Sequence, residues 1–511
     1  MPPSVEEIKI QSRHLRGNLY EKVYGSRDCK ASAAGGQLLK FFGDDREQRW
    51  RLLANKIPLD YRFMVRLPLA ADQYLAIDSL ADDVGSEAIR LTSRQAIQLH
   101  GVVKDDLAPL VPNLQQAAMA SLAECGEVER NIMSCPVPDG GQIRDQTAAL
   151  AKALAHHLKP ATAAYVELFV DGKKVYDVRQ EEPLYGSSYL PRKFKTAFAV
   201  WGDNCTDIYC HELGLVTYPP AEGGTERWAV LVGGGQGVAR THPLLAKPLA
   251  SVDRDQLTAV AEAIITVQRD HGNRTDRRYA RMKYLIEEWG LTRFRQEVER
   301  RTGFRLDPPL PLRWADPDDH LGWHSDGAGK GFLGLYVPQG RIADFASASL
   351  KTGLRRVVEQ YRPQLRLTAQ HNLLLVGLTG EDKEAILHIF ERHGLGSPGQ
   401  RTPLERSAMA CVELPTFGLA LTEAERVMPA VLEQIRRYWC ALGLADTPRV
   451  VRMTGCPNNC VRAELAEVGF GGAGPDKYHI YLGGNRAGTR LAQKFLERVS
   501  SPSSGRRCAA S

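Results

Sequence analysis

The strongest candidate for chemistry is a pair of cysteines in a short loop near the C-terminus. Cys456 and Cys460 lie in TGCPNNC, directly after the apolar strand pattern VVRM. Proline and two asparagines between the thiols favour a tight turn with exposed backbone N–H groups. The C-x3-C spacing differs from the C-x2-C of zinc ribbons, and the sequence has no second pair with zinc-type spacing. The segment therefore predicts either a loop that holds an iron–sulfur cluster or two structural cysteines.

A second candidate is a pair of lysines in RKFKTAF. Lys193 and Lys195 are two residues apart, so both project to the same face of an extended chain. A pocket for a small oxyanion needs fixed cationic donors that bind the oxygens and assist their departure. Lysines at the solvated edge of a strand would show the same pattern, so the spacing alone leaves both interpretations open.

Composition limits the classes of protein to consider. The chain has 511 residues, 43% hydrophobic and 25% charged, which predicts two to four folded domains. The net charge of +6 is not gathered into a basic tract, so nucleic acid is not an expected partner. No apolar run reaches the roughly 18 residues of a membrane span, and the N-terminus has no signal-like apolar core. We therefore expect a cytoplasmic protein that does not bind a membrane.

The sequence contains an internal repeat at an offset of 276 residues. IRLTSRQAIQLHGV (89–102) aligns with LRLTAQHNLLLVGL (365–378), and ERNIMSC (129–135) falls on ERSAMAC (405–411) in the same register. A looser third pair is FMVRLP (63–68) with FLGLYVP (332–338). Two matches in one register predict two homologous halves.

Each repeat shows the same order of elements. A short strand is followed by a helical stretch, predicted at 71–84 and 342–361, and then by the strand that contains RLT. Further α/β segments are expected at 197–237, 253–302 and 450–484, which makes the fold class α+β.

Nine sequence blocks, in order, identify a resemblance to a known family. They are HLRGNLYE, FMVRL, IRLTSRQAIQLHG, ERNIMSCP, YLPRKFKTAF, GNRTDRRYARMKYLIE, MACVELPTFGLALTEAER, TGCPNNC and YLGGNRAGTR. The chain resembles the sirohaem and iron–sulfur family of sulfite and nitrite reductases, most closely the sulfite reductase haemoprotein subunits, from about Val5 to about Val499.

The resemblance implies a three-domain reductase with duplicated ferredoxin-like α+β repeats. The two halves of the duplicated domain are expected at 1–140 and 313–403, a sirohaem-binding α/β domain at 141–312, and a cluster- and sirohaem-binding α/β domain at 404–499. Residues 500–511 are small and polar, and they predict a disordered tail.

In this family a C-x5-C pair and a C-x3-C pair hold a four-iron cluster. The resemblance implies that Cys411, Cys456 and Cys460 are ligands of a [4Fe-4S] cluster and that Cys460 also bridges to the sirohaem iron. The fourth position departs from the pattern, because Phe417 stands there and cannot ligate iron. Another group could complete the cluster, the cluster could be incomplete, or the copy could be impaired. Cys440, in RRYWCAL, is expected to pack in the core rather than to serve as a ligand.

The resemblance also implies an anion pocket and a cradle for sirohaem. Cations expected around the substrate are Arg66, Arg130, Lys193 and Lys195. Sirohaem carries eight carboxylates and needs basic and amide donors, and those expected here, besides Cys460, are Arg90, Arg94, Gln95 and Asn131. Three basic residues expected on one helix fit either cofactor contact or a solvated face, namely Arg277, Arg281 and Lys283.

The electron donor is expected to be a separate protein. The glycine run VGGGQG (232–237) lacks G-x-G-x-x-G spacing, so it predicts a turn near the macrocycle and not a nucleotide site. Without a flavin or nicotinamide fingerprint, electrons must come from a diflavin reductase subunit or a ferredoxin.

Three functional hypotheses follow. The leading one is an assimilatory-type sulfite reductase haemoprotein that reduces sulfite to sulfide with six electrons. Nitrite reductase, which makes ammonia on the same cofactors, is the first alternative. The second is a non-catalytic relative, suggested by Phe417 and by recognisable sequence that stops near Val499, short of the family's usual further helical segment.

Overall fold

The computed structural model describes most of the chain. Described are residues 6, 37–40, 51–54, 61–66 and, with short gaps, 69–500. The gaps are 103–105, 120–126, 161–166, 171–172, 178–181, 187, 220–225, 238–241, 316–317, 397–400, 415 and 418–419. The predicted tail lies outside the described residues except for Ser500.

Two four-stranded sheets carry the repeats. The first has the order β14-β4-β5-β3, formed by Arg341–Ile342, Ile89–Leu91, Ala96–Val102 and Tyr61–Arg66. The second has the order β12-β13-β18-β17, formed by Gly322–Ser325, Gly331–Leu335, Leu373–Leu378 and Gln364–Leu367. The repeats exchange backbone pairing, since β14 of the second repeat pairs with β4 and Leu69 of the first pairs with Leu365.

Backbone detail confirms the duplication at the predicted offset. Gly101 and Gly377 occupy equivalent positions, and both have positive φ, 79° and 91°. Equivalent threonines close the same turn, because the Thr92 hydroxyl accepts from the Ala96 N–H at 3.1 Å and the Thr368 hydroxyl accepts from the Asn372 N–H at 3.0 Å. A shared turn geometry explains why these residue types recur in the sequence.

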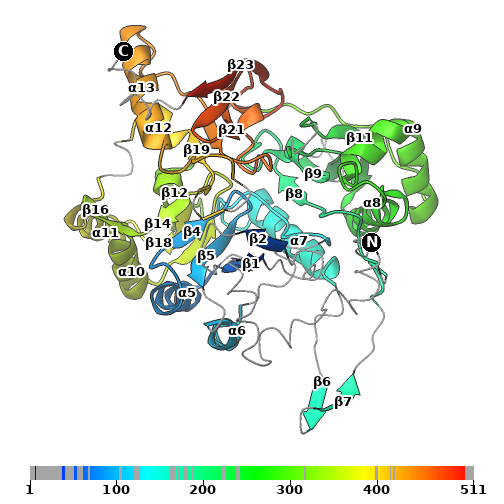
Figure 1. The fold of residues 1–511 in the computed structure, drawn as a ribbon, viewed down its shortest axis with the longest axis horizontal. Helices are drawn as coiled ribbons and strands as arrows, with labels where there is room; N and C mark the ends of the chain where they lie inside the picture. The colour runs from blue at the N-terminus through cyan, green and yellow to red at the C-terminus, as the bar shows by residue number, and fades with distance from the viewer. Residues whose placement is uncertain are drawn as a thin grey trace.

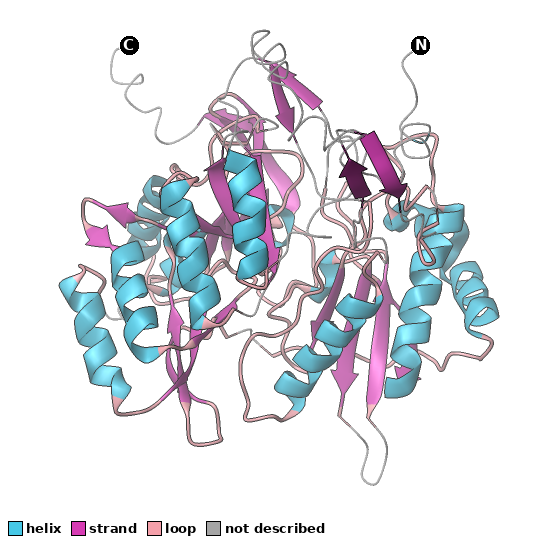
Figure 2. Cartoon of the chain, turned by 90° about the horizontal axis from the view of Figure 1, so that it is seen from below, coloured by secondary structure: helices cyan, strands magenta, loops and turns pink. Residues whose placement is uncertain are grey.

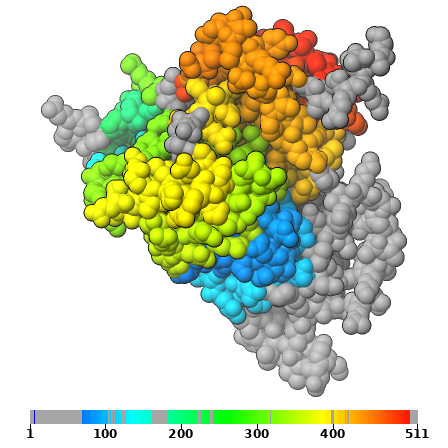
Figure 3. Space-filling view, turned by 90° about the vertical axis from the view of Figure 1, so that its left-hand side faces the viewer, coloured from blue at the N-terminus to red at the C-terminus, as the bar shows by residue number. Residues whose placement is uncertain are grey.

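One apolar core joins the two repeats. Helix α5 (Ala71–Asp83) lies beside α10 (Leu350–Tyr361), and both bury apolar residues in that core (Figures 1 and 2). Residues of both repeats also form one continuous face in Figure 3, with blue next to yellow-green. The predicted helix at 342–361 begins later than expected. Its first residues instead form β14 and the hairpin β15–β16 (Asp344–Phe345, Ala348–Ser349), because Ile342 pairs with Ile89 in the first sheet.

An α/β layer separates the repeats in sequence. Its sheet has the order β11-β10-β9-β8, formed by Lys247–Asp253, Arg227–Val232, Leu213–Tyr218 and Thr196–Ala199. Its helices are α7 (Ile143–His157), α8 (Leu257–His271) and α9 (Met282–Thr302). The block GNRTDRRYARMKYLIE was expected to be one helix, but 272–281 form a loop. Asn273 accepts the N–H groups of Thr275 and Asp276 there, which ends the helical pattern.

The C-terminal sheet carries the cysteine loop. Its order is β19-β20-β21-β22-β23, formed by Ala408–Ala410, Val451–Thr454, Val468–Gly474, Lys477–Leu482 and Gln493–Ser500. Helices α12 (Pro403–Arg406) and α13 (Met428–Ala441) belong to the same region. The prediction for Cys440 was wrong: α13 buries its first turns through Met428, Val431 and Leu432, and Cys440, near its end, is exposed.

The remaining elements are short. They are the hairpins β1–β2 (Gln37–Lys40, Arg51–Ala54) and β6–β7 (Glu167–Val170, Lys173–Asp177), the helices α6 (Leu107–Gln116) and α11 (Asp382–Arg392), and the 3-10 turns η5 (Ile208–Cys210), η6 (Arg254–Gln256), η7 (Pro338–Gly340) and η9 (Ala463–Leu465). Among the described helices, none combines the length and apolarity that a membrane crossing requires.

A buried ion-pair cluster joins these parts. Asp207, which precedes η5, lies 2.9 Å from Arg452 on β20 and 2.6 Å from Arg462 after the cysteine loop. Arg462 also donates to the carbonyls of Ser93 and Ala369, at 3.3 and 3.1 Å. Those two residues are equivalent positions of the two repeats, so one guanidinium contacts both repeats and the α/β layer.

The equivalent glycines give a matched test of the fold. Alanine at Gly377 would meet no atom within 4 Å, so its only cost is the left-handed backbone. We expect the free energy of unfolding to fall by about 1 kcal/mol. Alanine at Gly101 would also meet Ser86 at 3.0 Å, so we expect the free energy of unfolding to fall by about 2–3 kcal/mol. Melting temperatures of both variants check this order, and equal losses would contradict it.

The buried carboxylate gives a second test. Asp207→Asn leaves two buried guanidiniums without their anion. We expect the free energy of unfolding, measured in urea at neutral pH, to fall by about 3–5 kcal/mol. The exposed Asp446→Asn is the control, and it should change little.

The pH dependence of this loss follows from Asp207. Burial acts to raise its pKa, but Arg452 and Arg462 outweigh burial and lower it. The stabilisation that ionised Asp207 contributes to the fold is therefore complete above about pH 4, the ordinary carboxylate pKa. It is lost as the pH falls through the lowered pKa of Asp207. The difference between wild type and Asp207→Asn should shrink on acidification. A difference that stays constant down to the acid limit of folding would contradict this assignment.

Candidate active site

Two parallel strands bring the three cysteines together. Strands β19 and β20 are neighbours with Ala410 opposite Met453, so the chain after each strand leaves the sheet at the same edge. The N–H of Cys411 still bonds to the carbonyl of Met453 at 3.1 Å. Cys456 follows in the loop after β20 and is buried, whereas Cys460, at the end of that loop, is exposed.

The thiols are chemically distinct. The Cys411 and Cys460 side chains form a hydrogen bond, which lowers the pKa of Cys460, and Lys195 and Lys193 lower it further. The same hydrogen bond and burial raise the pKa of Cys411. Cys460 is therefore the thiol of the pair that ionises more readily, and a thiolate is the form that binds a metal.

A buried glutamate that the sequence analysis did not single out lies beside these thiols. Glu413 accepts from the Thr454 hydroxyl at 3.2 Å and is hydrogen-bonded to Cys456. Burial and the nearby Cys460 raise its pKa to about 7. Phe417, half-buried, lies one turn further on, and its N–H donates to the Glu413 carbonyl at 2.8 Å. The only sequence signal was an acid two residues after Cys411, which does not by itself indicate a ligand.

The predicted cations gather on the side of Cys460. Lys193 and Lys195 flank the fully buried Phe194, whose backbone bridges to Glu129 and whose carbonyl accepts from the Arg130 N–H at 3.0 Å. Burial first, then Lys195 and Arg130, lower the pKa of Lys193 well below its ordinary value. Burial and Arg94 lower the pKa of Lys195 to about 8, while Cys460 opposes this shift. Cations held this close together bind an anion strongly.

Arg66 cannot be placed in this group. It is the last residue of β3, and its backbone pairs with Ala96. Its side chain lies outside the described residues.

The predicted sirohaem ligands contact the first repeat itself and, through Gln95 and Arg90, the second repeat. Arg94 and Asn131 exchange hydrogen bonds, each to the backbone carbonyl of the other. The Gln95 amide donates to the carbonyls of Ser134 and Leu367, at 2.7 and 2.9 Å. Arg90 is buried and donates to Ala410 at 2.8 Å, next to Cys411.

The basic residues at 277–283 contact protein groups. In the loop before α9, Arg277 pairs with Glu127 and Arg281 pairs with Glu212. On α9 itself, Lys283 donates to the His242 carbonyl at 2.5 Å. The glycine run packs closely: a side chain at Gly234 would meet the Tyr209 carbonyl at 2.2 Å, which explains glycine there. The Asn459 amide, inside the cysteine loop, donates to the Gln236 carbonyl at 3.3 Å.

Known families match this architecture. The nitrite and sulphite reductase 4Fe-4S domain matches residues 150–306, and the nitrite/sulfite reductase ferredoxin-like half domain matches residues 59–117 and again 324–393. The two half-domain matches fall on the two repeats. In solved structures, the Mycobacterium tuberculosis NirA protein covers 91% of this chain and 81% of its own, with a TM-score of 0.73. At 21% identity that likeness concerns the fold.

Relatives of similar length share more sequence. The sulfite reductase [NADPH] hemoprotein beta-component of Paenibacillus sp. (strain JDR-2) is 38% identical over 98% of this chain and 90% of its own length. The protein with the same name from Myxococcus xanthus (strain DK1622) is 39% identical over 97% of this chain and 90% of its own. The α+β fold, the duplicated half domains and these relatives show that the chain belongs to the nitrite and sulfite reductase family of oxidoreductases.

Proposed function

We propose that this protein is the haemoprotein of a sulfite reductase and reduces sulfite to sulfide with six electrons. The observation that carries the proposal is the convergence of Lys193 and Lys195 on Cys460, whose thiol pKa they lower. A small, doubly charged oxyanion is the substrate class that such a cationic group suits. The relatives named as sulfite reductase hemoproteins support the same assignment.

The donor set suits the cofactors of this family. The mutually contacting thiols of Cys411 and Cys460, with Cys456 in the same loop, are soft ligands appropriate to an iron–sulfur cluster. Glu413 would supply an oxygen at the fourth position in place of Phe417. Arg94 and Asn131 would face the sirohaem carboxylates. Sirohaem held there would supply a redox-active iron.

The protein's own side chains would bind and protonate the substrate oxygens. Reduction of sulfite to sulfide removes three oxygens as water, so each oxygen needs protons as well as a cationic partner. Lys195, with a pKa near 8, gives up a proton more readily than an ordinary lysine and recovers it near neutral pH. The planar guanidinium of Arg130 would fix the orientation of the anion.

Electrons would come from a separate reductase. The names of the relatives include NADPH, and we therefore favour an NADPH-dependent diflavin subunit over a ferredoxin as the donor. Such a pair would work in the cytoplasm, where NADPH is available.

The choice between sulfite and nitrite has a direct test. We expect kcat/KM for sulfite to exceed that for nitrite by at least about tenfold, a difference of about 1.4 kcal/mol in transition-state binding. Both anions should be assayed on the same preparation with a chemical reductant, so that the identity of the donor does not matter. A preference for nitrite would overturn the assignment.

Phe417 and Glu413 give a test of the cluster. In the wild type we expect four irons beyond the sirohaem iron, with matching acid-labile sulfide. Glu413→Gln should lower this number to three and give the magnetic resonance signal of a three-iron cluster, because an amide is a poor ligand for iron. Adding Phe417→Cys to Glu413→Gln should restore four irons by supplying a thiolate.

Glu423→Gln is the matched control for this experiment. Glu423 lies in the same segment and pairs with Arg426, so its loss should leave iron content unchanged. A three-iron signal in the wild type would exclude Glu413 as a ligand. A wild type without any cluster would favour the non-catalytic alternative.

A further inference from the structure

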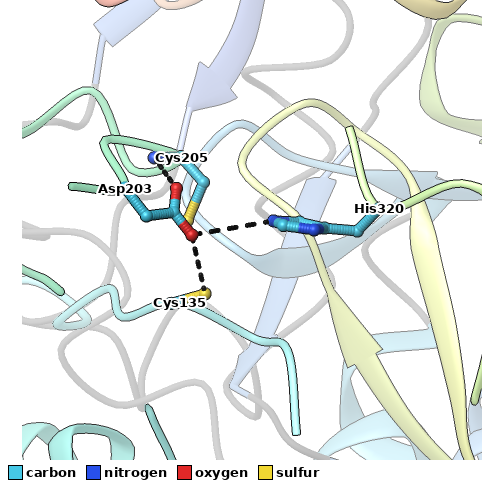
Figure 4. Close-up of side chains that lie close together, drawn as sticks. All are labelled: Cys135, Asp203, Cys205 and His320. Carbon is cyan, nitrogen blue, oxygen red and sulfur yellow. Dashed lines mark hydrogen bonds and ion pairs between the residues drawn. The ribbon is translucent and has the colours of Figure 1, made fainter. Parts of the chain in front are cut away.

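Four metal-binding side chains converge at a second place in the protein. They come from segments far apart in sequence: Cys135, Asp203 and Cys205 from the edge of the α/β layer, and His320 from the turn before β12. One ligand atom from each lies within 4.8 Å of all the others, and all four residues are buried (Figure 4). None of them belongs to the cluster loop or to the cationic group beside Cys460.

The carboxylate is oriented toward the other three donors. Asp203 Oδ1 accepts the N–H of Cys205 at 3.0 Å, which fixes the side chain. Its Oδ2 then lies 3.7 Å from Cys135 Sγ and 3.9 Å from His320 Nε2. The short D-x-C spacing therefore presents one oxygen and one sulfur from the same loop.

The imidazole is oriented in the same way. His320 Nδ1 lies 3.6 Å from Asp318 Oδ2, and the backbone N–H of His320 donates to Asp318 Oδ1 at 3.0 Å. Its other nitrogen, Nε2, is buried without a hydrogen-bond partner and points into the group. A carboxylate behind one nitrogen and a free second nitrogen is the arrangement that orients metal-binding histidines.

A carboxylate and two sulfurs lie close together around one cation. The side chains of Cys135 and Cys205 are hydrogen-bonded to each other. Arg144 on α7 lies 2.8 Å from Cys135 Sγ and pairs with Asp203. A carboxylate removed from water is costly unless a cation compensates it, and a divalent ion supplies more positive charge than one guanidinium and can also bind the two sulfurs.

The surroundings are those of a closed site. Cys135 and Cys205 pack with Phe332 of β13 and with Leu374 and Val376 of β18, so an apolar wall from the second repeat excludes water. With four protein donors, no coordination position remains for a substrate. Such sites are structural rather than catalytic.

We propose that Cys135, Asp203, Cys205 and His320 bind a structural zinc ion that ties the second repeat to the α/β layer. Two sulfurs, one nitrogen and one oxygen form a tetrahedral set that zinc accepts and that magnesium or calcium does not favour. Zinc bonds of about 2.0–2.3 Å would draw the donors to about 3.3–3.8 Å apart, so small side-chain shifts suffice. Arg144 would turn away from Cys135 and keep its contact with Asp203.

A disulfide between Cys135 and Cys205 is the competing possibility. It would use the two sulfurs but leave His320 Nε2 without a hydrogen-bond partner, 3.9 Å from the Asp203 oxygen that pairs with Arg144. The convergence of all four donors, with Asp203 and His320 each held by a contact of its own, therefore favours a metal over a disulfide.

Element analysis of the intact holoenzyme tests the site. We expect about one zinc per chain in addition to iron, after purification without a metal-affinity step. X-ray absorption at the zinc edge, which ignores iron, should show two sulfurs at about 2.3 Å and two lighter donors at about 2.0 Å. This measurement needs no variant and does not depend on the proposed sulfite reductase activity.

Variants then assign the ligands. Cys135→Ser and His320→Asn should lose at least about nine-tenths of the zinc and melt at lower temperature, because the metal contributes to folding. Two matched controls should keep it: His324→Asn, four residues further on, and Cys440→Ser on the exposed side of α13. Iron content should be retained in all four.

Three results would overturn the proposal. They are a wild type without zinc, zinc with a different ligand set, and a Cys135–Cys205 disulfide found by mass spectrometry under non-reducing conditions.

Discussion

The buried charges at Asp207 constrain the whole arrangement. A carboxylate and two guanidiniums removed from water are tolerable only if their contacts are kept together, so Asp207, Arg452 and Arg462 fix three chain segments relative to one another. Arg462 follows Cys460 by two residues and also bonds to equivalent carbonyls of both repeats. The position of the cysteine loop therefore depends on the duplication itself: if either repeat shifted, one of the two carbonyl contacts would be lost.

The same low-dielectric interior sets the chemistry. Crowded lysines are costly when protonated, and burial lowers the pKa of Lys193 and Lys195, whereas the neighbouring thiol of Cys460 becomes easier to ionise. The lysines thus favour a negative charge on the thiol, and a negative thiol favours positive charge on the lysines. A site with this balance would suit anions on its lysine side and metal ions on its cysteine side.

Sequence patterns predicted the features that depend on local geometry. The repeat was visible because Gly101 and Gly377 occupy equivalent left-handed backbone positions inside β5 and β18, and the cysteine loop because its spacing is local. Patterns failed where distant contacts determine the structure. Ile342 joins a strand because Ile89 is opposite it, and Cys440 is exposed because only the first turns of α13 are buried. The sequence did not single out Glu413 or His320, since their importance arises from partners that only the folded chain brings near.

The substitution at Phe417 is easier to understand in this light. A cluster ligand is defined by the position of its donor atom and not by its place in a motif. The hydrogen bond from Phe417 to Glu413 makes one turn of chain, which brings positions four apart to the same side. A carboxylate at the first of these positions can therefore reach the space that a thiolate at the second would occupy. It would bind iron less tightly than sulfur does, because oxygen is the harder donor. Exchange of a thiolate for a carboxylate would then alter the charge and hydrogen bonding that set the reduction potential of a cluster, while the surrounding fold stays the same.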